Sequence, residues 1–129
     1  YNTIADTLEL IDAIGADNVT IHADTYHMNV EEPGFAGPLA RAGARLGCIH
    51  LSESDRGVPG QGNVRWDDVF SGLRAGGYAG PLVLESFAAI NPDLAGATCM
   101  WRTPSYTSDQ LVREGVAFLR ERAAAAGLA

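Results

Sequence analysis

The sequence lacks the features that would place it in a membrane or outside the cell. No apolar run approaches the roughly 20 residues that a membrane-spanning helix needs. No charged segment followed by an apolar segment opens the chain, so we identify no secretory signal. Cys48 and Cys99 are far apart and follow neither a disulfide framework nor a zinc-binding spacing. These absences predict a cytoplasmic protein with free thiols and no membrane partner. Because the first residue is Tyr1 and not Met, we also expect the native N-terminus to lie upstream.

Clusters of basic residues are also missing. Nine Lys and Arg residues stand against 16 Asp and Glu residues, which gives a net charge of −7. A protein that follows a phosphate backbone needs clustered Lys and Arg. The composition therefore excludes nucleic acid as a partner. Hydrophobic residues make up 47% of the 129 residues, which is enough to form an ordinary globular core.

Helical and strand patterns alternate along the chain. Apolar spacing and end signals predict helices over residues 4–14, 38–45, 67–75 and 107–125. Short apolar runs predict strands over residues 19–23, 48–51 and 81–85. Thr107 and Gln110 predict a capping box for the last helix. This order is typical of βαβ units and a parallel sheet with right-handed crossovers.

The number of elements indicates a barrel fragment. A complete (β/α)₈ barrel takes about 250 residues, or about 30 for each βα unit. We therefore predict that residues 1–129 form one partial domain of an α/β (β/α)₈ TIM barrel, with about three parallel strands and four helices. The alternative is an independent three-stranded doubly wound domain, which would leave two exposed parallel edges.

Polar side chains lie on one face of the predicted strands. Residues two apart in a strand share a face. One face carries His22, Asp24, Cys48, His50, Val83 and Glu85, and the other carries Ile21, Ala23, Ile49, Leu51, Leu82 and Leu84. The apolar face suits a layer of helices. We therefore expect Asp24, His50 and Glu85 to point inward at the carboxyl ends of three strands, where α/β folds carry their sites.

Each of these three residues has an ordinary explanation when it is taken alone. Asp24 could form a turn, His50 could be a hydrogen-bonded structural residue, and Glu85 could meet solvent. Together, the two carboxylates would be costly to bury without a cation. Carboxylates with one imidazole and no thiolate favour Mn²⁺, Mg²⁺ or Co²⁺ over zinc.

Four motifs carry a resemblance to a known family. They are DTYHMNVEE (24–32), HLSESDRGVPGQG (50–62), LVLESF (82–87) and CMWR (99–102). Together they resemble the D-tagatose/D-psicose 3-epimerases, ketose 3-epimerases of the xylose isomerase-like barrel class. The resemblance extends over essentially the whole chain and corresponds to the C-terminal half of such a barrel.

The resemblance implies a function and a site. It implies that Asp24, His50 and Glu85 bind a divalent metal, usually Mn²⁺, and that His27 and Arg56 hold the oxygens of a small sugar substrate. The implied reaction is proton transfer through an enediolate held on the metal, with Glu85 as a catalytic carboxylate. Enzymes of this class commonly form homodimers or homotetramers. For Arg56 the alternative is an ion pair with Asp55 or Glu53, and for His27 it is a solvent-facing position.

The family pattern also contains a residue that this sequence lacks. It places a fourth metal ligand, a Glu that is also the second catalytic carboxylate, on the strand before the first helix. Glu9 cannot replace it because Glu9 lies within the helix of residues 4–14. Since epimerisation needs a base on one face of the sugar and an acid on the other, we expect the 129 residues alone to be inactive.

Two other functions remain open. The first is another xylose isomerase-like enzyme, such as a hydroxypyruvate, aldose–ketose or inosose-type isomerase, which would share most metal ligands. The second is a catalytically inert fragment that binds metal or associates with itself. An apurinic-site endonuclease of the same barrel class is disfavoured because the chain has three histidines and a charge of −7.

Overall fold

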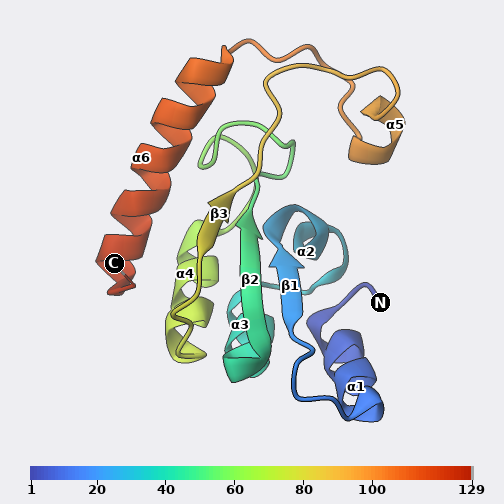
Figure 1. The fold of residues 1–129 in the computed structure, drawn as a ribbon. Coiled ribbons are helices and arrows are strands. Elements are labelled where there is room, and N and C mark those ends of the chain that lie inside the picture. The colour runs from blue at the N-terminus through green and yellow to red at the C-terminus, as the bar shows by residue number, and fades with distance from the viewer. Residues whose placement is uncertain (129) are drawn as a thin grey trace.

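Three parallel strands form the centre of the structure, a computed structural model that describes residues 1–128 (Figure 1). They are β1 (Ile21–Asp24), β2 (Leu46–Leu51) and β3 (Leu82–Leu84), in the spatial order β1-β2-β3. Asp24 lies opposite His50 in the first pair of strands, and His50 lies opposite Val83 in the second pair. The carboxyl ends of the three strands therefore lie at one level, as the sequence predicts.

A bulge at the start of β2 sets this register. Ile21 pairs with Leu46, but the next residue of β1, His22, pairs with Cys48, so Gly47 has no partner in β1. A Cβ atom on Gly47 would lie 2.9 Å from the Cβ of Thr20, a separation that real side chains avoid. Glycine therefore permits the bulge. Its consequence is that His22 and Asp24 face the same side of the sheet as Cys48 and His50.

Four long or medium helices correspond to the four predicted ones. They are α1 (Ile4–Ile14), α3 (Ala36–Ala42), α4 (Trp66–Ala75) and α6 (Ser108–Ala126), and a 3₁₀ turn, η1 (Gly43–Arg45), follows α3. Helix α3 packs between α1 and α4, and α4 also packs against α6. Figure 1 shows α3 and α4 behind the sheet. Within residues 1–128, no helix is both long and apolar enough to cross a membrane.

The helices cover the face of the sheet that the sequence analysis assigned to them. Ile21 and Ala23 of β1 and Ile49 and Leu51 of β2 are all buried in the hydrophobic core. The opposite face carries His22, Cys48 and His50, which range from half-buried to exposed. The alternation of apolar and polar residues therefore decides which side of the sheet holds the core.

Two further helices lie in segments for which the sequence predicts neither a helix nor a strand. They are α2 (Thr25–Glu31), directly after β1, and α5 (Ala95–Thr98), in the long segment after β3. Asp24 begins α2 because its Oδ1 accepts a hydrogen bond of 2.8 Å from the backbone N–H of Tyr26. The side chains of Tyr26 and Met28 are buried and hold α2 against the core. A helix of seven residues, such as α2, shows too little periodicity to be predicted from the sequence alone.

The N-terminal cap of α6 is partly as predicted. The Thr107 hydroxyl accepts a hydrogen bond of 3.2 Å from the backbone N–H of Gln110. The second bond of a capping box would run from the backbone N–H of Thr107 to the side chain of Gln110. In the described residues the Gln110 amide instead donates to Glu114, one turn further on. One half of the capping box is therefore present.

Gly72 allows the close approach of α3 and α4. A Cβ atom at this buried position would lie 2.8 Å from the Cα and carbonyl oxygen of Ala36 and 3.0 Å from the Cβ of Leu39. Gly72→Ala should therefore lower the free energy of unfolding by about 1–3 kcal/mol, as overpacked cores do.

Urea unfolding followed by circular dichroism measures this change. The matched control is Gly96→Ala, whose added methyl group would meet no atom within 4 Å. Equal stability of the two variants would contradict the packing that we describe between α3 and α4.

Candidate metal and sugar site

The structure brings Asp24, His50 and Glu85 together. Asp24 ends β1, His50 lies near the end of β2, and Glu85 directly follows β3. One ligand atom from each residue lies within 4.8 Å of the other two. The Nδ1 of His50 is 3.3 Å from Oε2 of Glu85. All three side chains are partly buried, so they face a shared space that solvent can still reach.

Arg56 supplies the positive charge between the two carboxylates. Its Nη1 donates to Oδ2 of Asp24 at 2.9 Å, to Oε2 of Glu85 at 2.5 Å and to the hydroxyl of Ser52 at 3.0 Å. Arg56 is 5% exposed, so these contacts form away from bulk water. The alternative in which Arg56 pairs with Asp55 or Glu53 is wrong, because the guanidinium points at the strand ends.

His27 and Tyr26 hold the other sides of the guanidinium. The Nε2 of His27 lies 3.1 Å from Nη2 of Arg56, and the ring of Tyr26 stacks 4.0 Å from its Cζ. A cation above an aromatic face is stabilised by the electrons of the ring. The side chain of His27 is 67% exposed, so it borders the site and stays open to a ligand.

The charges of Asp24 and Glu85 oppose each other in this space. Burial raises the pKa of Asp24, and a hydrogen bond with Glu85 raises it further, against the lowering effect of Arg56. Burial alone would raise the pKa of Glu85 as well, but Asp24, Arg56 and His50 together lower it below its ordinary value. One carboxyl group therefore holds a proton more readily than the other, as expected of two acids that share a site.

The donor set fits a hard divalent cation. Oδ2 of Asp24 and Oε2 of Glu85 both point at the Nη1 atom of Arg56, so a positive charge already occupies the position between them. The Nε of Arg56 is buried and has no hydrogen-bond partner among the described residues. The guanidinium is thus incompletely satisfied where it lies. Two carboxylates and one imidazole are the ligands that Mn²⁺ or Mg²⁺ would take at this position.

Two residues that the sequence analysis did not assign to the site link the ends of β1 and β2. The hydroxyl of Thr25 donates to the carbonyl oxygen of Ser52 at 2.6 Å, and the backbone N–H of Ser52 donates back to that hydroxyl at 2.8 Å. Both residues are fully buried. Their signal in the sequence was a small hydroxyl residue directly after each strand, a pattern too common to single out.

Glu53 holds the loop that carries Arg56. Its carboxylate is fully buried and accepts four hydrogen bonds of 2.9 Å, from the backbone N–H groups of Ser54, Gly60 and Val64 and from the indole N–H of Trp66. Arg56 has a φ of 61°, a left-handed conformation that is uncommon outside glycine. Its backbone N–H donates to the carbonyl oxygen of Glu53 at 3.0 Å. Glu53 therefore has a structural role in this loop.

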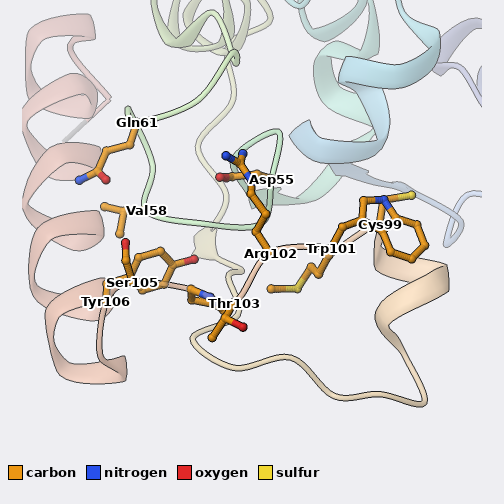
Figure 2. Close-up of a pocket in the computed structure, with 11 residues that line it drawn as sticks. Asp55, Val58, Gln61, Cys99, Trp101, Arg102, Thr103, Ser105 and Tyr106 are labelled. Atoms are coloured by element: carbon orange, nitrogen blue, oxygen red, sulfur yellow. The ribbon is translucent and has the colours of Figure 1, made fainter.

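A cavity lies beside the cluster of charges. It has a volume of about 340 Å³ and is lined by the loop after β2 (Asp55, Val58, Gln61) and by residues 99–106. Figure 2 shows the labelled side chains arranged around it, between α6 and the segment that follows α5. Asp24, His50 and Glu85 do not line it. The cavity therefore adjoins the proposed site without containing the groups that could carry out chemistry.

Comparison with known proteins shows that the chain is similar to sugar epimerases. Residues 1–122 match the family model described as xylose isomerase-like TIM barrel. The chain is 39% identical over 123 residues to an L-ribulose 3-epimerase of Methylomonas sp. (strain DH-1), a match that covers 94% of this chain and 43% of that protein. It is 36% identical over 115 residues to a D-psicose 3-epimerase of Enterocloster bolteae, covering 88% of this chain and 38% of that protein.

Solved structures agree with these sequence matches. A crystal structure of D-allulose 3-epimerase from Methylomonas sp. in complex with D-allulose superposes with a TM-score of 0.85 at 39% identity, covering 94% of this chain and 43% of that chain. The predicted partial barrel and the resemblance to ketose 3-epimerases are confirmed. The chain spans about two fifths of the length of the curated relatives it matches.

Glu53→Gln should loosen the loop that carries Arg56. The amide replaces one carboxylate oxygen with an NH₂ group, which then faces backbone and indole N–H donors. Hydrogen bonds to a charged acceptor contribute about 1.5–3 kcal/mol each, so we expect a loss of about 3 kcal/mol in the free energy of unfolding.

Urea unfolding gives the global effect, and the rate of tryptic cleavage after Arg56 gives the local one. Glu31→Gln makes the same chemical change at an exposed position and serves as the control. If cleavage after Arg56 were no faster in Glu53→Gln than in Glu31→Gln, Glu53 would not be what orders this loop.

Proposed function

The chain belongs to the xylose isomerase-like TIM barrel family, and from this premise we propose that it is part of a metal-dependent ketose 3-epimerase. The observation that carries the proposal is the meeting of Asp24, His50 and Glu85 beside the buried Arg56. The similarity to relatives named L-ribulose 3-epimerase and D-psicose 3-epimerase supports the substrate class.

Asp24, His50 and Glu85 are the residues that would hold the cation. Mn²⁺ is our first choice, with Mg²⁺ or Co²⁺ as alternatives, because all three accept oxygen ligands and one imidazole. Such a cation would act as a Lewis acid toward the oxygens of the sugar. Catalytic metal sites keep positions open for a substrate, and the partial exposure of these three side chains is consistent with that requirement.

Glu85 is the residue that would move a proton. Epimerisation beside a ketone removes the proton from one face of the carbon and returns a proton to the other face. The carboxylate of Glu85 is 32% exposed, so it can approach a substrate from one side of the site. An ionised carboxylate at this position can accept the proton. We propose that the carboxylate for the other face comes from outside residues 1–129.

Arg56 and His27 would hold the sugar. Arg56 presents a fixed guanidinium to the same space, and its N–H groups can donate to oxygens that gain negative charge as the proton leaves. With a cation held by Asp24 and Glu85, Nη1 of Arg56 would be free to donate a hydrogen bond to a ligand. His27, which contacts Arg56 from the solvent side, would bind a sugar hydroxyl at the edge of the site.

Glu85→Gln in the full-length protein should reduce interconversion of ketose 3-epimers. The amide keeps the shape of the side chain but cannot accept the proton, and general-base contributions alone amount to about 10²–10⁴-fold. Chromatography of L-ribulose, D-fructose and D-tagatose incubated with Mn²⁺ measures the rate for each sugar.

Glu31→Gln is the control, because Glu31 is exposed on α2 and should leave turnover unchanged. Near-normal turnover by Glu85→Gln would remove Glu85 from the mechanism. If the unsubstituted protein converts none of the three sugars but isomerises hydroxypyruvate or an aldose, the proposed reaction is wrong and the related isomerase function takes its place.

A further inference from the structure

A second group of metal-ligating side chains lies on the same face of the sheet, toward the amino ends of the strands. His22 of β1 pairs in register with Cys48 of β2, and His50 lies two residues beyond Cys48 on the same side. One ligand atom of each of the three residues lies within 4.8 Å of the other two. The rings of His22 and His50 meet edge to face, with their centroids 4.2 Å apart. The group therefore gathers two imidazoles and one thiol.

The chemistry of this group differs from that of the Asp24–His50–Glu85 cluster. A thiolate and imidazoles bind softer cations such as Zn²⁺, whereas carboxylates favour Mn²⁺ and Mg²⁺. Zinc–nitrogen and zinc–sulfur bonds are about 2.0–2.3 Å long, so ligand atoms within 4.8 Å of one another reach a common ion with small side-chain rotations. Cys48 is a free thiol, half-buried on a strand, and His22 is exposed.

We propose that His22, Cys48 and His50 form a binding site for a soft divalent cation, with Zn²⁺ as the expected ion. Three protein ligands leave the fourth tetrahedral position to water or another ligand. Because β1 and β2 fix the three residues in adjacent register positions, no backbone movement is needed to assemble the site.

His50 belongs to both groups, which links the two sites. An ion on His22 and Cys48 takes His50 away from Asp24 and Glu85, so the soft cation weakens binding of Mn²⁺ at the other cluster. This second part rests on the proposed function, because it requires that Asp24, His50 and Glu85 hold a divalent cation. Zn²⁺ bound to His22 and Cys48 would then inhibit epimerisation by removing His50 from the Mn²⁺ ligands. This effect would add to any direct replacement of Mn²⁺ by Zn²⁺.

Cobalt absorption tests the soft site by itself. Co²⁺ added to the reduced full-length protein should produce a thiolate-to-cobalt charge-transfer band, and added Zn²⁺ should abolish the band. Cys48→Ser should lose the band, while Cys99→Ser, which alters the exposed thiol outside the group, should keep it. His22→Asn removes a ligand and should weaken Co²⁺ binding on the order of 10–100-fold or more. Loss of a residue that only supports a ligand already costs about 10–100-fold in metal affinity. Absence of the band in the unsubstituted protein, or its survival in Cys48→Ser, would overturn the site.

Electron paramagnetic resonance of free Mn²⁺ tests the link between the sites. Zn²⁺ should raise the apparent dissociation constant for Mn²⁺ about tenfold more in the unsubstituted protein than in Cys48→Ser. An equal effect of Zn²⁺ in both proteins would overturn the sharing of His50. If the cobalt band forms as described and Mn²⁺ does not bind at all, the soft site stands and the proposed metal-dependent function fails, so the two outcomes are distinguishable.

Discussion

The ends of β1, β2 and β3 are organised around one contact, the Nη1 atom of Arg56 between the carboxylates of Asp24 and Glu85. Two carboxylates this close repel each other, and partial burial increases the cost because water no longer screens them. The buried guanidinium offsets that cost. The surrounding groups serve to keep it in place: the Ser52 hydroxyl, the Tyr26 ring and the loop held by Glu53. The site is therefore assembled around an internal cation that a metal ion would have to replace.

The register of the sheet determines what lies near this contact. The bulge at Gly47 turns His22 and Asp24 to the same side as Cys48 and His50, so one face carries two donor sets in sequence. The carboxylates of Asp24 and Glu85 lie at the carboxyl ends of the strands. The imidazole of His22 and the thiol of Cys48 lie two residues nearer the amino ends of β1 and β2. His50 stands between them and belongs to both. A single backbone irregularity thus decides which donor groups this face of the sheet brings together.

Strand periodicity accounts for what could be predicted from the sequence. Asp24, His50 and Glu85 were found because side chains alternate along a strand, a local rule that needs no tertiary information. The partners of Arg56 could not be found in that way, because they depend on the path of its loop. Hydrogen bonds from Gly60, Val64 and Trp66 to the carboxylate of Glu53 hold that loop. The group of His22, Cys48 and His50 was missed for a related reason. Zinc sites are recognised in a sequence by the spacing of Cys and His residues along the chain. These ligands instead come from neighbouring strands, whose register depends on a bulge.

Anomalous diffraction from crystals of the full-length protein grown with Mn²⁺ tests the central claim most directly. We predict one manganese peak within bonding distance of Asp24, His50 and Glu85, and a guanidinium of Arg56 that no longer contacts at least one of the two carboxylates. A manganese ion bound elsewhere, or Arg56 keeping both contacts while the ion is bound among the three residues, would contradict it.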